Sequence, residues 1–241
     1  MPSLLRFARL DSTQTKNMKS YIWYAIGEVL LIFAGITLAL WFSNWNDERQ
    51  LREVERSVLE NIVVNLEANV SLLNRSIERD EIIVATCARL IESISRKDEL
   101  QDSFKSDLDG CRWWTSPFLN YAAYESLNAR GNELISDPVL RNAIVYLYDR
   151  TYSHLVNDTD KLSWNFQSAV IEPIVNRHLR RTAQNEFTPI NYEALLEADE
   201  FLSMLYMKRS YQIDSIAVQN ATREATIEVI GQIQTWLDKP Q

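Results

Sequence analysis

The chain has 241 residues, a net charge of −8 and a pI near 4.9. Nucleic-acid binding needs clustered Lys and Arg that neutralise phosphates, so this charge balance argues against a nucleic-acid partner. Apolar residues make up 46% of the chain, which is enough for a packed core, and only five Gly and six Pro occur. Such a composition favours helices over a turn-rich β fold.

Residues 1–21 form a short basic segment with four cationic side chains and one acid. From Ile22 to Ser43 the only acidic or basic side chain is Glu28. Helix of this length covers about 33 Å, enough to cross a hydrocarbon core of about 30 Å. We therefore predict a transmembrane helix over 22–43, in contact with a lipid bilayer. The aromatic residues expected at its two interfaces are Trp23, Tyr24, Trp41 and Trp45.

Two other interpretations of this stretch exist. A cleaved signal peptide fits poorly, because the apolar run is too long and no small-x-small cleavage site follows it. A buried helix of a soluble protein is the second alternative. The basic segment favours a cytoplasmic N-terminus. Residues 44–241 then lie outside, which predicts a bacterial inner-membrane protein with a periplasmic domain.

Glu28 is the unusual residue of the span, because a charge deep in lipid is costly and is a functional hypothesis by default. It is either protonated or solvated near the interface, paired with a group on another helix, or part of an ion path in an oligomer. At helical spacing Glu28, Gly35 and Ala39 share one face, and Gly27 adds a small residue nearby. Small residues let helices approach closely. This face therefore predicts association, as a homo-oligomer or with another membrane protein.

The helix is expected to continue through the juxtamembrane residues Asn44, Trp45 and Asn46, since no Pro or Gly interrupts it. Apolar residues then recur at three- and four-residue steps to about Lys97, which is typical of the core-facing helix of a bundle. Residues 98–112 are expected to form a polar loop with one short turn at most. The two cysteines, Cys87 and Cys111, are predicted either to form one disulfide or to remain two buried thiols.

Further helices are expected over 118–130, from Pro138, over 158–181 and over 199–237, with a turn at 188–191. The predicted fold is all-α: one N-terminal transmembrane helix that continues into a long helix of an extramembrane antiparallel helical bundle. In the helix at 158–181, the residues expected to face the core are Leu162, Phe166, Val170 and Ile174. In the last helix they are Leu202, Leu205, Ile213, Ile216, Ile227, Ile230 and Trp236.

Two segments carry a resemblance: YAIGEVLLIFAGITLAL followed by NWNDER, and YESLNARGNELISDPVLRNAI. Together they resemble a bacterial membrane-protein family known only as a domain of unknown function. The resemblance implies a basic N-terminus, one apolar helix with a Gly-Glu pair near its start and a helical remainder, and it implies no activity. The chain departs from the family pattern at residues 41–43 and at Asp47. The resemblance makes Glu28 and the 44–46 segment the first residues to test.

No catalytic constellation stands out in the sequence, so no enzyme activity and no cofactor are predicted. The only histidines, His154 and His178, belong to no zinc-binding pattern, so no metal site is predicted. Four aromatic residues crowd together: Trp113, Trp114, Tyr121 and Tyr124. They build either a small-molecule pocket or a bulky bundle core.

The sequence thus predicts a single-pass inner-membrane protein that works as a homo-oligomeric or partner-binding scaffold. Two alternatives remain open: an oligomeric ion channel or proton pathway that uses Glu28, and a periplasmic ligand-sensing module.

Overall fold

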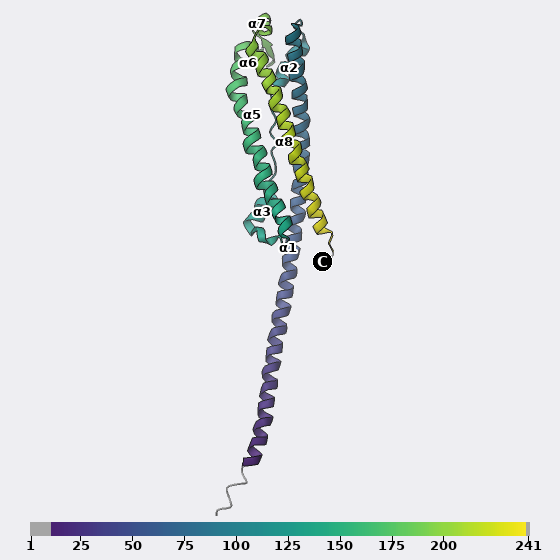
Figure 1. The fold of residues 1–241 in the computed structure, drawn as a ribbon, viewed down its shortest axis with the longest axis vertical. Helices are drawn as coiled ribbons and strands as arrows, with labels where there is room; N and C mark the ends of the chain where they lie inside the picture. The colour runs from purple at the N-terminus through teal and green to yellow at the C-terminus, as the bar shows by residue number, and fades with distance from the viewer. Residues whose placement is uncertain (1–10, 240–241) are drawn as a thin grey trace, which may run out of the picture. The chain divides into compact units, whose positions relative to one another are not determined.

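The computed structural model describes the backbone of residues 11–239 and the side chains of residues 23–239. Helices form almost all of it, so the predicted all-α fold is confirmed (Figure 1). The first helix, α1, runs unbroken from Asp11 to Arg96. It begins eleven residues before the expected start at Ile22, within the predicted basic segment 1–21. The rest of that segment, residues 1–10, lies outside the described residues.

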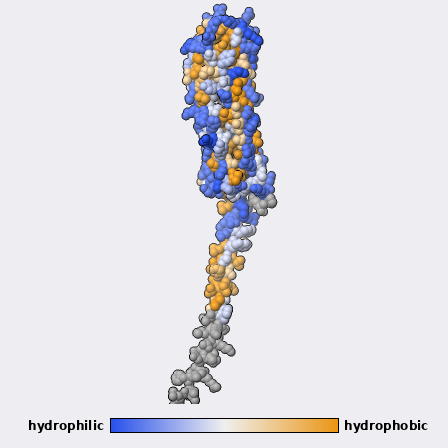
Figure 2. Space-filling model, in the orientation of Figure 1, coloured by the Kyte–Doolittle hydropathy of each residue, from blue (hydrophilic) through white to orange (hydrophobic). Residues whose placement is uncertain are grey.

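The chain divides into two compact units, residues 1–54 and 55–241. Residues 44–54, which the prediction assigned to the extramembrane domain, fall in the first unit. Among the described helices, only α1 is long and apolar enough to cross a membrane, and its apolar part lies in the first unit. Every described side chain from Trp23 to Val54 is exposed. Figure 2 shows apolar side chains on the visible face of the middle of this part of α1, followed by hydrophilic ones nearer Val54.

The second unit is built on three helical stretches of nearly equal length. They are the end of α1 from Glu55, a helical run over 138–178, and α8 from Asp199 to Leu237. Each has about 40 residues and is therefore about 60 Å long. In Figure 1 the first two run in one direction along the unit and α8 returns in the other. The C-terminal end of α8 is tied to α1, since Nη1 of Arg56 donates to the carbonyl oxygen of Leu237 at 2.9 Å.

The run over 138–178 is one continuous helical path, and not two helices separated near Asp158 as expected. It begins at Asp137, whose carboxylate caps the helix by accepting from the backbone N–H of Val139 at 2.8 Å, with Pro138 in the first turn. Wide π-type turns interrupt it three times, and such turns shift the inward face of a helix. Its parts are α4 Pro138–Tyr146, η2 Leu147–Tyr152, η3 His154–Asp160, α5 Lys161–Phe166, η4 Gln167–Ile171 and α6 Glu172–His178.

In the sequence between the first two helical stretches, the chain runs back along the bundle. Only the two ends of this returning segment are helical. It consists of α2 (Asp102–Cys111), an extended segment over 112–121, α3 (Ala122–Arg130) and the short η1 (Asn132–Leu134). Extended chain rises about 3.3 Å per residue, against about 1.5 Å in a helix. Because of its extended part, this segment of about 30 residues therefore spans the same length as a helix of about 40. The expected polar loop at 98–112 was wrong, since α2 fills ten of those residues and buries Phe104 and Leu108.

A small β-hairpin, absent from the sequence-based prediction, joins the helical run to the last helix. Strand β1 (Leu179–Arg181) pairs antiparallel with β2 (Phe187–Pro189). Of the expected turn at 188–191, the first two residues belong to strand β2 and the last two form a bend that leads into the one-turn helix α7 (Tyr192–Leu196). Leu179 and Phe187 are buried, so the hairpin closes the end of the bundle with apolar side chains.

Two apolar clusters form the core, one at each end of the bundle. The disulfide-end cluster gathers Cys87, Leu90, Phe104 and Phe201 with their neighbours. The α3-end cluster gathers side chains from α1, α3, η2 and the end of α8; among them are Leu59, Leu66, Leu127, Tyr148 and Ile233. Between the clusters, α8 turns a run of polar side chains inward.

Candidate functional site

The first candidate site is the apolar part of α1. Glu28, Gly35 and Ala39 follow one another on one helical face, as the sequence predicts for a straight helix. A Cβ atom built on Gly27 or Gly35 would meet nothing within 4 Å. Nothing in the described chain therefore packs on this face, and a neighbouring helix has room to approach it closely.

The juxtamembrane residues Asn44, Trp45 and Asn46 lie inside α1 and are exposed. The ring of Trp45 lies 5.8 Å from the ring of Phe42, one helical turn earlier. The helix therefore passes through this segment without a bend that Pro or Gly would cause. No described residue outside α1 contacts these side chains through a hydrogen bond or ring pair.

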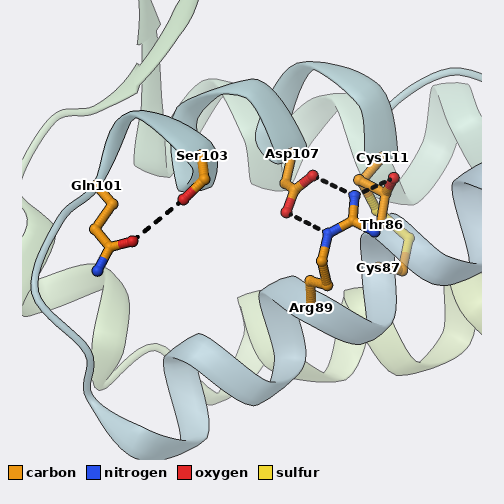
Figure 3. Close-up of polar contacts among 7 residues, drawn as sticks. All are labelled: Thr86, Cys87, Arg89, Gln101, Ser103, Asp107 and Cys111. Atoms are coloured by element: carbon orange, nitrogen blue, oxygen red, sulfur yellow. Dashed lines mark hydrogen bonds and ion pairs between the residues drawn. A yellow bond between two sulfur atoms is a disulfide. The ribbon is translucent and has the colours of Figure 1, made fainter.

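At the end of the bundle that contains α2, a disulfide joins Cys87 of α1 to Cys111 of α2 (Figure 3). The guanidinium of Arg89 donates two hydrogen bonds to the Asp107 carboxylate, from Nη2 to Oδ1 at 2.6 Å and from Nε to Oδ2 at 2.9 Å. Nη2 of Arg89 also donates to Oγ1 of Thr86 at 3.1 Å. A covalent bond and a bidentate ion pair thus hold α2 on α1 side by side.

The four aromatic residues expected to build either a pocket or a bundle core lie in two separate places. Tyr124 stacks on Tyr148 with ring centroids 4.4 Å apart, and Tyr121 lies 5.7 Å from the same ring. Tyr121 and Tyr124 both belong to the α3-end cluster, so these two residues are part of the bundle core. Trp113 and Trp114 lie instead on the extended segment. Trp114 meets Trp164 edge to face at 5.1 Å. The four residues therefore do not form one group: the tyrosines lie in the core and the tryptophans lie on the extended segment.

Tyr148 and Tyr152, next to Tyr121, are shielded from water. Burial raises the pKa of the Tyr148 phenol above its usual range and the pKa of Tyr152 to about 12. The Tyr152 hydroxyl has partners in Thr226 at 3.1 Å and Asn69 at 3.4 Å, whereas the Tyr148 hydroxyl has none among the described residues. These tyrosines are therefore neutral core residues at physiological pH.

The two tryptophans border an open groove of about 370 Å³ between α1 and the extended segment. We call it the aromatic–arginine groove. Arg75 and Arg79 come from α1, while Trp113 and Phe118 stand exposed on the other wall. The full lining is Leu72, Arg75, Ser76, Arg79 and residues 113–118, which include no acid.

The most unexpected feature is the polar layer at mid-bundle, which α8 supplies. Its inward residues between the two apolar clusters are all polar and all buried; they are Lys208, Gln212, Ser215, Gln219, Thr222 and Thr226. Of the apolar residues expected in the core, Ile213 is 43% and Ile227 is 51% exposed. Leu202, Ile230 and Trp236 are partly buried against the two apolar clusters. Only Leu205 of the seven predicted core residues of this helix is buried. The prediction of an apolar inward face was therefore wrong for the middle of α8.

Asp80 of α1 is the centre of the polar layer and has no exposed surface. Nε2 of Gln219 donates to its Oδ2 at 2.6 Å, and the Thr115 hydroxyl donates to its Oδ1 in a very short bond. Ser76 extends the chain by donating to Thr115 at 3.1 Å. Desolvation raises the pKa of Asp80, and the hydrogen bonds from Thr115 and Gln219 oppose that rise.

Lys208 is the cation of the polar layer and is only 4% exposed. Burial lowers its pKa to about 8, and attraction to Asp80 opposes the shift. The stem of Lys208 borders a small cavity of about 20 Å³ beside Leu90 and Met204, which has room for about one water molecule. Buried ionisable groups with shifted pKa values occur both at functional positions and in structural networks, and here the hydrogen bonds of Asp80 tie α1 to α8.

Among the described residues no group of three or more His, Cys, Asp or Glu is placed to hold a metal ion. The two histidines lie apart. His154 pairs with Asp158 at 2.8 Å, and His178 pairs with Glu200 at 2.7 Å. Asp158 lies one turn after His154 in the same segment η3, whereas Glu200 reaches His178 from α8.

No protein-family model, curated protein or solved structure matches the chain. The resemblance to an uncharacterised bacterial membrane-protein family therefore stays a prediction, carried by the residues around Glu28 and the 44–46 segment. What the chain does has to be argued from its own geometry.

Proposed function

We propose that this is a single-pass membrane protein of the bacterial inner membrane whose span associates with a second helix and whose helical bundle recognises a partner outside the cytoplasm. In this proposal the role is scaffolding without catalysis. The uncovered apolar part of α1 carries the proposal. Apolar side chains from Val29 to Phe42 all lie exposed, and no described segment packs on them. Exposed apolar surface of this extent marks a membrane or protein interaction site.

The face with Glu28, Gly35 and Ala39 favours association over a simple anchor. Two helices that approach on Gly35 and Ala39 bring their backbones close together. Glu28 then finds a polar partner on the neighbouring helix in place of lipid, which removes part of the cost of the buried acid. Copies of the same chain meet this requirement, since each presents the same face.

A matched pair of substitutions tests the association. At about 100° per residue, Ala39 lies about 20° from Glu28 around the helix and Ala34 about 120° away. Mass photometry of the full chain in lipid nanodiscs should show oligomers. Ala39→Leu should weaken the oligomer about tenfold, because close packing and interhelical bonds contribute about 1–2 kcal/mol. Ala34→Leu, the same chemical change on the other face, should leave it unchanged. A monomeric wild type, or equal effects of both changes, would refute the proposal.

An ion path through a ring of Glu28 side chains is the rival for the same face. Planar-bilayer recordings of the wild type and of Glu28→Gln separate the two functions. A cation current that Glu28→Gln reduces would favour conduction. Oligomers without current would leave association as the function of the face.

A further inference from the structure

We propose that the aromatic–arginine groove binds an extended, acidic peptide segment of a partner protein. This deepens the recognition role proposed for the bundle and does not depend on how the span associates. The argument rests on the charge of the groove, its exposed aromatic side chains and the unpaired backbone along one wall.

The charge of the groove opposes that of the chain. The protein carries 33 acidic and 25 basic residues, yet the lining holds Arg75 and Arg79 and no acid. No ion pair of the described side chains involves either arginine, whereas Arg49, Arg56, Arg89 and Arg177 each have a carboxylate partner. The two arginines lie four residues apart on α1, about 6 Å along one helical face. Two unpartnered guanidinium groups at this spacing fit two carboxylates on an extended ligand.

The aromatic wall provides the apolar half of the site. Phe118 is 82% exposed and Trp113 is 52% exposed, although the same segment also contains the buried Pro117. Arg112 lies over the Trp113 ring at 4.3 Å, which holds that indole in place. Exposed, positioned aromatic side chains next to arginine are the residue types that dominate the binding energy of protein interfaces.

The backbone of the same wall is held extended by side chains and not by a neighbouring strand. Residues 113–119 take part in no backbone–backbone hydrogen bond within the described chain. At one end, Asn69 of α1 bonds both backbone groups of Asn120, at 2.6 and 3.0 Å. In the middle, Thr115 is tied to Asp80. An extended segment that is held in place with free backbone groups can pair with a second extended chain, in the way a sheet edge takes up a peptide.

The hydroxyls at the base of the groove complete the match. Ser116 donates to Asp160 at 2.6 Å, and Thr115 donates to Asp80, so the proton of each hydroxyl is already used. Thr115 already accepts from Ser76, so its one remaining lone pair and those of Ser116 act as acceptors. A peptide supplies N–H donors for these acceptors and carboxylates for the arginines, whereas an acidic oligosaccharide supplies hydroxyl donors and no extended backbone to pair.

The experiment is a selection with a charge swap. A displayed library of random heptapeptides is selected on the full chain in lipid nanodiscs, with empty nanodiscs as the counter-target. The same selection is run on Arg75→Glu/Arg79→Glu. The control is Arg130→Glu/Arg150→Glu, which reverses two other exposed arginines without an ion pair in the described chain. We expect wild type and control to enrich peptides with two or more acids beside apolar residues, and the groove variant to lose them.

Fluorescence anisotropy of the enriched peptide gives the quantitative test. Both Arg75→Glu/Arg79→Glu and Phe118→Ala should weaken binding at least tenfold, while the control should change it less than twofold. Failure to enrich any peptide over empty nanodiscs would overturn the inference, and so would equal binding to the groove variant. Binding of a hexagalacturonate probe without peptide enrichment would also overturn it, in favour of a sugar site. Mass photometry of the same samples reports association separately, so the two proposals succeed or fail independently.

Discussion

The two longest helices of the bundle, α1 from Glu55 onwards and α8, differ in the kind of side chain that they bury along their middle. α1 buries apolar side chains along most of its length and admits few polar ones. α8 buries apolar side chains only near its ends and polar ones between Leu205 and Val229. Apolar burial at the two ends supplies most of the driving force for folding. The polar middle contributes directional bonds that fix which residues face each other.

The largest loss of stability should come from the apolar ends. Leu90→Ala removes a side chain that is 1% exposed from the disulfide-end cluster. Truncation of a buried leucine costs about 2–5 kcal/mol, because transfer energy is lost and a cavity is left. Thermal unfolding of the full chain in detergent should show a lower Tm by at least about 4 °C. Leu162→Ala, at an exposed position, should leave the Tm nearly unchanged, and equal losses would contradict the assignment of the core.

The disulfide should contribute next. It closes a loop between residues 24 apart in sequence, and a bond of that kind stabilises by about 2–4 kcal/mol. Cys111→Ser should therefore lower the Tm by several degrees, and a reducing agent should lower the wild-type Tm to a similar value. Intact mass after thiol alkylation shows whether the bond is present. A wild type that takes up two alkyl groups without prior reduction would refute the bond.

The polar layer should give stability a characteristic pH dependence. The folded state releases the Lys208 proton near pH 8, while the unfolded chain keeps it up to the ordinary pKa of 10.5. Between these values the unfolded state binds more protons, so the free energy of unfolding rises with pH. The rise is about 3 kcal/mol for a shift of this size. Denaturant titrations from pH 7 to 9.5, below the range in which the tyrosines of the unfolded chain ionise, should detect most of it, and Lys208→Met should abolish it. An unchanged rise in Lys208→Met would place its origin elsewhere.

Sequence periodicity found helices better than it found their inward faces. The two ends of α8 and the C-terminal end of α1 were predicted close to those observed, because long apolar repeats leave few alternatives, whereas α1 begins eleven residues before its expected start. For α8 the same reasoning chose Ile213 and Ile227 as core residues. It failed because burial there follows the partner helix, and Asp80 on α1 requires donors such as Gln219 opposite it.

Short elements failed for a different reason. In α2, Phe104, Leu108 and Cys111 follow a helical spacing that was available in the sequence, but surrounding acids and Gly110 masked it. The hairpin had no such signal, since each strand has three residues. The groove was partly visible, because the Trp113 and Trp114 pair stood out. Its arginines are 34 or more residues earlier in the chain, and only the fold brings them to the same place.

A smaller loss is expected for one amide of the polar layer. Gln219→Ala removes the donor at 2.6 Å from Asp80 and leaves that buried carboxylate with fewer partners. The expected cost is about 1–3 kcal/mol, typical of a buried polar group that loses its bond. Gln234→Ala, an exposed glutamine of the same helix, is the matched control and should cost little. Denaturant midpoints of the two variants measure the difference directly, and the comparison fails if they coincide.

The smallest effect should come from Ile227, one of the residues that periodicity assigned to the core. Ile227→Gln replaces an apolar side chain on the outer side of α8, where half of it already meets solvent. Surface substitutions of this kind change stability by no more than about 0.5 kcal/mol. An inward Ile227 would instead cost several times more, because a polar amide would enter an apolar core without a partner. The denaturant midpoint of this one variant therefore decides which face of α8 is inward, and with it whether the bundle has a polar middle at all.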